Sequence, residues 1–348
     1  METSHFRRRR NLGFFCCIAT LLWIDPSAAL LLPGQKRSLG SLEARTFAIS
    51  GNSLFSTSGL FSAPFQESLL KRQSTVAGDF SSEAAAQSQD ITYSLHVKVK
   101  GKVLTLIGFL FIISCMASCL ITFPVFCVCW AYSKLFDQKT RSVMDWCVSL
   151  WAKLAMGAMG YRVKLEGAEN IPEGGSVLVC PNHTSFLDIL TLSAFLPKGF
   201  KYVTKREILD IPFIGWSMRM AGHIPVMRQD RRSQLETVKK SIAALKDGNS
   251  ILMFPEGTRT KNGRLQAFKK GPFSIATKSE ATILPVSICN LPKWFPVSAA
   301  MPLRVPNDVI LRVHPPISAK GVSEEELMAK TFDAIASGLP GEQRPMAT

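Results

Sequence analysis

A run of 31 residues, from Val103 to Ser133, contains no charged side chain and limits where this chain can fold. As one helix the run would be about 46 Å long, more than the roughly 30 Å of a bilayer's hydrocarbon core. Pro124 interrupts it, so a single tilted membrane helix and a re-entrant helical hairpin both fit the pattern. A buried helix of a soluble domain is less favoured at this length. We expect a membrane segment at residues 98–135.

The N-terminus has the composition of a targeting region. Arginines at 7–10 precede an apolar stretch at 11–24 and small residues at 26–29, a pattern typical of a secretory signal peptide at residues 1–29. Residues 30–90 are rich in Ser, Gly and Ala and resemble a transit peptide, which we expect to be disordered. Together the two segments predict a plastid (chloroplast) membrane protein imported through the secretory system. The alternatives are an uncleaved signal anchor, or a linker after a plain signal in the endoplasmic reticulum membrane.

Beyond Lys139, short β-rich runs alternate with helical patterns. The expected strands are 176–180, 250–254, 282–287 and 309–313, and the expected helices are 186–195, 232–246, 271–279 and 323–337. Such alternation is typical of an α/β fold. We expect residues 140–340 to form an α/β domain with a mostly parallel sheet flanked by helices, preceded by the N-terminal membrane helix or helical hairpin.

Positive charge is concentrated in the middle of this domain. The whole chain carries a net charge of +15, and residues 198–278 hold 17 Lys and Arg against six Asp and Glu, a net of +11. Such a field attracts phosphate groups. Aromatic residues do not alternate with these charges and no nucleic-acid-binding signature is present, so membrane lipids are the expected partners rather than nucleic acid. Six of the nine cysteines lie in the two apolar runs, and no spacing indicates a disulfide framework or a metal site.

The first motif that can carry chemistry follows the expected strand 176–180 and reads Asn182-His-Thr-Ser-Phe-Leu-Asp188. Ligands of open α/β sheets bind at the carboxyl ends of the strands. If His183 lies in the turn and Asp188 reaches back from the first helical turn, the carboxylate fixes the imidazole tautomer and leaves Nε2 as a base. The other interpretation of Asp188 is a capping box with Ser185, and that of His183 is a buried structural histidine.

The second motif, Phe254-Pro-Glu-Gly-Thr-Arg259, follows the expected strand 250–254. Gly257 permits a tight turn, and the guanidinium of Arg259 can bind a phosphate with two hydrogen bonds. A turn closed by a Glu–Arg pair is the alternative. A third group comprises Lys205-Arg-Glu207, followed by Gly222-His-Ile-Pro-Val-Met-Arg228, which includes His223. Taken alone, this group would be a basic loop and a strand on a solvated face.

Together these motifs resemble the glycerolipid acyltransferase family, in particular the 1-acylglycerol-3-phosphate acyltransferases, over residues 103–337. The blocks at 182–188 and 254–259 match the family in order and separation, and residues 222–228 and 283–286 resemble two further blocks. The resemblance implies that His183 is the general base and Asp188 its orienting partner. It also implies that Lys205 and Arg259 hold the acceptor's phosphate. Its last implication concerns the acceptor pocket, which would be shaped by Glu256, Gly257, Thr258 and Arg228.

The activity implied by the resemblance is transfer of a fatty acyl group from a thioester to the sn-2 hydroxyl of lysophosphatidic acid, giving phosphatidic acid. No metal or bound cofactor is implied, and the acyl carrier, either acyl carrier protein (acyl-ACP) or coenzyme A (acyl-CoA), would be a co-substrate. Another lysophospholipid acyltransferase or a glycerol-3-phosphate acyltransferase would use the same base. A non-catalytic membrane protein that binds anionic lipids is the alternative outside the enzymes.

Overall fold

The computed structural model describes residues 96–99, 102–227, 230–299 and 301–346. The targeting segments expected at 1–29 and 30–90 lie outside the described residues, as does Arg228. A small antiparallel hairpin, β1 (His96–Val99) and β2 (Lys102–Thr105), precedes the first described helix.

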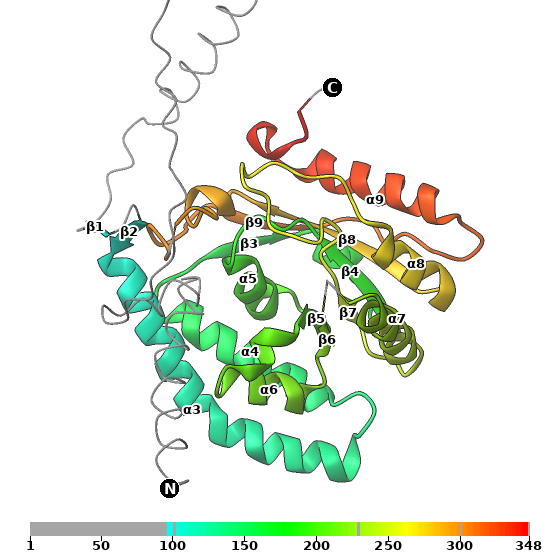
Figure 1. Cartoon of the computed structure of the whole chain (residues 1–348), viewed down its shortest axis with the longest axis horizontal. Helices are drawn as coiled ribbons and strands as arrows, with labels where there is room; N and C mark the ends of the chain where they lie inside the picture. The colour runs from blue at the N-terminus through cyan, green and yellow to red at the C-terminus, as the bar shows by residue number, and fades with distance from the viewer. Residues whose placement is uncertain (1–95, 100–101, 228–229, 300, 347–348) are drawn as a thin grey trace, which may run out of the picture. The chain divides into compact units, whose positions relative to one another are not determined.

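A seven-stranded sheet forms the centre of the α/β domain (Figure 1). Its strands are β3 (Val163–Glu166), β4 (Val177–Pro181), β5 (Lys201–Lys205), β6 (Ile224–Val226), β7 (Ile251–Leu252), β8 (Thr282–Cys289) and β9 (Val309–Val313). Their order is β3-β9-β8-β4-β7-β5-β6. All neighbouring pairs are parallel except β8 and β9, which are antiparallel. The prediction of a mostly parallel sheet is confirmed.

Helices cover both faces of the sheet because alternate strand residues point into two separate apolar cores. In β4, Val177 and Val179 belong to the core beneath α4 (Ser142–Gly157) and α5 (Leu187–Phe195), whereas Leu178 and Cys180 belong to the opposite core. That second core includes α7 (Arg231–Lys246), α8 (Lys270–Ser279) and α9 (Glu324–Gly338). The described residues also include α6 (Ile214–Ala221) and the short 3₁₀ turns Ala168–Asn170, Arg206–Asp210, Leu291–Lys293 and Gly341–Gln343.

The candidate membrane helix is α3 (Leu106–Phe136), which is long and apolar enough to cross a membrane. Of the two arrangements that the sequence left open, the structure has the single helix, which continues through Pro124. Proline removes one backbone hydrogen bond and bends a helix, and Figure 1 shows α3 bending part-way along its length. The helix packs mainly against α4 and also touches α6. Its outer side presents large apolar side chains to the surroundings, among them Ile121, Val128 and Leu135.

The structure also contains elements that the sequence patterns did not reveal: α4, α6, β3 and β5. Strand β5 begins and ends with lysine, so its composition does not resemble a buried strand. Lys201 is nevertheless only 3% exposed, because its ammonium group pairs with the carboxylate of Asp145 on α4. A long-range ion pair of this kind leaves no trace in local periodicity.

Candidate active site

Three adjacent parallel strands, β4, β7 and β5, end at the same edge of the sheet and bring the sequence motifs together. His183 follows β4, the turn of Phe254–Arg259 follows β7, and Lys205 is the last residue of β5. This edge, at the carboxyl ends of the strands, is where α/β sheets bind their ligands.

His183 and Asp188 are in direct contact. Nδ1 of His183 lies 2.8 Å from Oδ2 of Asp188, which is fully buried at the start of α5. The same carboxylate accepts the backbone N–H groups of Thr184 at 2.7 Å and Ser185 at 2.8 Å. An ionised carboxylate only accepts hydrogen bonds, so Nδ1 carries the proton and Nε2 has the lone pair of a base. Asp188 thus orients the imidazole and also supplies half of the capping box.

Two other polar residues of the first motif fix the turn that carries His183. The side-chain amide of Asn182 donates to the carbonyl of Ile288 at 3.1 Å and accepts from its N–H at 2.7 Å, which ties the end of β4 to β8. The hydroxyl of Ser185 donates to the carbonyl of Phe295 at 2.8 Å. Sequence reasoning assigned no role to Asn182, although its place beside His183 in the motif was a usable signal.

The second motif forms a tight turn packed against the first. Gly257 has φ +76°, in the region that favours glycine, and its N–H donates to the carbonyl of Phe254. The Phe254 ring stacks on the imidazole of His183, with ring centroids 3.8 Å apart and planes at 18°. The N–H of Thr260 donates to the carbonyl of His183 at 3.0 Å. The two motifs therefore form one interlocked unit.

Glu256 lies beneath this turn, only 2% exposed, rather than facing open solvent. Its Oε1 accepts the backbone N–H of His183 at 2.7 Å and its Oε2 accepts that of Gln266 at 3.1 Å. Burial raises the pKa of Glu256 to about 8, although the two N–H donors favour the ionised form. Its geometry is that of a brace for the histidine backbone.

The candidate phosphate-binding residues line the same edge. Burial lowers the pKa of Arg259, while the negative charge of Asp188 acts in the opposite direction. Lys205 and Thr258 are exposed, and Gly257 is partly exposed with its Cα facing the stem of Lys269. A cationic edge beside a base suits an acceptor that carries a phosphate and a hydroxyl.

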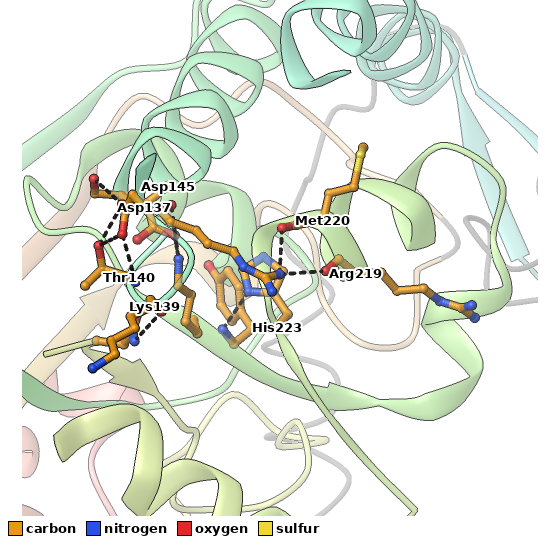
Figure 2. Close-up of polar contacts among 12 residues, drawn as sticks. Asp137, Lys139, Thr140, Asp145, Arg219, Met220 and His223 are labelled. Atoms are coloured by element: carbon orange, nitrogen blue, oxygen red, sulfur yellow. Dashed lines mark hydrogen bonds and ion pairs between the residues drawn. The ribbon is translucent and has the colours of Figure 1, made fainter. Parts of the chain in front are cut away.

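His223, from the third group, lies beside the start of β5 rather than at its carboxyl end, among the contacts drawn in Figure 2. It is buried, and its Nδ1 accepts the backbone N–H of Tyr202 at 3.0 Å. Burial, with the nearby Lys201, lowers the pKa of His223 to about 3, so this ring stays neutral and is a structural residue.

An apolar pocket lies beside the first motif. Leu187, adjacent to Asp188, forms part of its wall together with Ile107 and Phe111 of α3, Tyr161 and the loop 302–306. The space that this pocket encloses is about that of a single water molecule. Among the residues that the structure describes, no group of three or more His, Cys, Asp or Glu side chains is placed to hold a metal ion.

This fold and this pair of interlocked motifs match those of the acyltransferases. The sequence profile of the acyltransferase family matches residues 162–289. The crystal structure of the 1-acyl-sn-glycerophosphate acyltransferase PlsC from Thermotoga maritima superposes with a TM-score of 0.58 at 28% identity, covering 67% of this chain and 93% of that one.

Curated proteins of similar sequence point to the same family. A 1-acyl-sn-glycerol-3-phosphate acyltransferase from Chlamydomonas reinhardtii is 35% identical over 235 residues, which cover 66% of this chain and 70% of the relative. The chloroplastic 1-acyl-sn-glycerol-3-phosphate acyltransferase of Arabidopsis thaliana is 40% identical over 184 residues, 53% of this chain. This chain spans about half the length of that protein and of a chloroplastic relative from Brassica napus, 51% and 53% respectively. The chain belongs to the acyltransferase family.

Proposed function

We propose that this protein transfers a fatty acyl group from a thioester to the sn-2 hydroxyl of 1-acylglycerol-3-phosphate, giving phosphatidic acid. The observation that carries the proposal is the His183–Asp188 pair, 2.8 Å apart, at the strand edge that also presents Lys205 and Arg259. The names of the relatives, all 1-acyl-sn-glycerol-3-phosphate acyltransferases, support the same acceptor.

In the proposed reaction, Nε2 of His183 removes the proton of the sn-2 hydroxyl as its oxygen attacks the thioester carbonyl. Asp188, hydrogen-bonded at Nδ1, stabilises the imidazolium that forms. The tetrahedral intermediate collapses with loss of the thiolate, which takes the proton back from Nε2. The ester C–O bond forms and the C–S bond breaks, so no acyl-enzyme is required.

Substrate positioning supplies the rest of the proposed rate enhancement. Arg259 and Lys205 bind the acceptor's phosphate, and Gly257 and Thr258 border the acceptor. Both chains of the product are lipid-soluble, which fits the apolar helix α3. The acyl donor is acyl-ACP or acyl-CoA, since the basic edge suits the phosphates of either carrier. We further propose residence in a plastid membrane, in keeping with the chloroplastic relatives.

The experiment is an acyl-transfer assay with the full chain in detergent or vesicles. Each donor is offered with lysophosphatidic acid, lysophosphatidylcholine or glycerol-3-phosphate. We expect phosphatidic acid from lysophosphatidic acid, and only a small residual rate from the His183→Ala variant. Preference for either other acceptor would replace the proposed substrate. If the protein binds vesicles but no pair of donor and acceptor gives turnover, the result would instead indicate an anionic-lipid-binding protein.

A further inference from the structure

The rings of His183 and Phe254 make the closest aromatic contact of the candidate site. Their planes differ by 18° and their centroids are 3.8 Å apart. The proposed reaction uses Nδ1 and Nε2, both at the edge of the imidazole, and does not involve the two faces of the ring. Phe254 covers one of those faces with an apolar surface.

The hydrogen bond at Nδ1 does not by itself set the tilt of the imidazole ring of His183. The hydrogen bond to Asp188 fixes one ring atom, but the ring can still tilt about that point, and Nε2, on the far side of the ring, moves most. A flat side chain in stacking contact blocks this tilt from one side and excludes water from that face. Since general-base catalysis depends on the direction of the lone pair, the contact bears on the chemical step.

The backbone of His183 is fixed by the same turn that carries Phe254. Oε1 of Glu256 accepts its N–H at 2.7 Å, and the N–H of Thr260 donates to its carbonyl at 3.0 Å. The turn 254–260 thus meets His183 at the ring face, the amide nitrogen and the carbonyl oxygen. The turn therefore holds His183 in place in addition to carrying Arg259.

We infer that Phe254 is a positioning residue, whose ring orients the imidazole of His183 so that Nε2 faces the acceptor's hydroxyl. The inference rests on the proposed function. Phe254 acts through His183 and touches no reacting atom. A phosphate-binding role would change KM for the acceptor, and a packing role would change stability alone, so the three roles give different measurements.

The test compares steady-state kinetics of the full chain carrying Phe254→Leu, Phe254→Tyr or Phe332→Leu. A misplacement near 1 Å costs up to about 100-fold in rate, so we expect kcat of Phe254→Leu to fall about 10- to 100-fold with KM for lysophosphatidic acid within about twofold. Phe254→Tyr keeps the stacked plane and should restore most of kcat. Phe332 of α9, also partly buried and in ring contact with Phe268, is the matched control and should retain kcat.

Two further measurements separate a positioning role of Phe254 from a phosphate-binding or a packing role. In a His183→Ala background, Phe254→Leu should cause no additional loss, because residues acting as a unit are not additive. Should Phe254→Leu fail to fold, Phe254→Met takes its place. Unchanged kcat, a loss confined to KM, or an equal loss in Phe332→Leu would overturn the inference. If wild-type protein makes no phosphatidic acid, the proposed function fails, and NMR relaxation of ¹³C-labelled His183 still tests whether Phe254→Leu increases ring motion.

Discussion

Asp188 serves two structural tasks because its carboxylate faces both the start of α5 and the imidazole. It accepts backbone N–H groups of Thr184 and Ser185 and the Nδ1–H of His183. The sequence offered these as alternatives, a helix cap or a catalytic partner, and the structure contains both sets of contacts. One oxygen, Oδ2, accepts all three hydrogen bonds, so a single substitution affects stability and turnover together.

Asp188→Asn should therefore lower both the stability of the fold and the turnover. The amide retains one oxygen acceptor but not the negative charge that stabilises the imidazolium. We expect a stability loss of about 1–2 kcal/mol from the cap and a fall in kcat of up to about 10⁴-fold. Thermal melting and single-turnover assays measure the two effects. In a His183→Ala background the kinetic loss should vanish while the stability loss remains, and a persistent kinetic loss would give Asp188 a role independent of His183.

Arg259→Lys keeps the positive charge at the strand edge but loses the planar pair of donors. A charge-assisted hydrogen bond is worth about 1.5–3 kcal/mol, so kcat/KM for lysophosphatidic acid should fall roughly 10- to 150-fold, mostly through KM. KM for the acyl donor should change less. Equal effects on both substrates would place Arg259 outside the acceptor's phosphate site.

Glu256 makes the stability of the site depend on pH. Its pKa is about 8 in the folded chain and near 4.5 in the unfolded chain, so folding favours the protonated form. The stability contributed by this group is complete below pH 4.5 and is lost as pH rises through 8. Glu256→Gln does not titrate and loses one acceptor. The melting temperature of this variant should lie below that of the wild type at pH 6, and the difference between the two should be smaller at pH 9. A difference that widens with pH would contradict the raised pKa.

At the scale of elements, polar contacts of Arg141, before α4, and of Asp145 in its first turn connect this part of the chain to α6 and to the sheet (Figure 2). Asp145 of α4 pairs with Lys201 of β5 at 2.6 Å, and both side chains are mostly buried. Arg141, with φ +49°, donates to the carbonyl of Met220 at 3.0 Å near the end of α6. Burial raises the pKa of Asp145 to about 6, although Lys201 favours its ionised form. The pair thus specifies how α4 meets β5 while adding little net stability.

Lys201→Met should be strongly destabilising, because it leaves the buried Asp145 carboxylate without its cation. We expect a loss of about 3–5 kcal/mol in urea unfolding, whereas Asp145→Leu/Lys201→Met should recover most of it. Lys164→Met provides the control, since the Lys164–Glu166 pair is largely exposed at the lysine and should contribute less than about 1 kcal/mol. A double variant as unstable as Lys201→Met would mean that the cation, rather than the pairing, stabilises the junction.

At the scale of the whole molecule, sequence reasoning succeeded where the determining signal was local. The apolar strands β4, β8 and β9 and the capped helix α9 matched closely because periodicity and end signals lie within each segment. Elements fixed by distant partners were missed. Strand β5 depends on Asp145, 56 residues away, and the bracing role of Glu256 depends on the backbone of His183, 73 residues away. The sequence motifs were enough to locate the site. The residues that support it from distant positions in the sequence could be found only from tertiary contacts.

Targeting is also a property of the whole molecule, and the N-terminal composition predicts it. A basic segment and an apolar stretch within residues 1–29 precede a Ser-rich, acid-poor stretch, so residues 1–72 fused to a fluorescent reporter should reach the plastid of an alga whose plastids lie within the secretory system. Without residues 1–29 the reporter should stay in the cytosol, because the transit-like part alone cannot enter the secretory pathway. Microscopy with plastid and endoplasmic reticulum markers measures both. A full-length fusion confined to the endoplasmic reticulum would overturn the plastid assignment and leave the proposed acyl transfer intact, since the residues of the strand edge do not depend on the compartment.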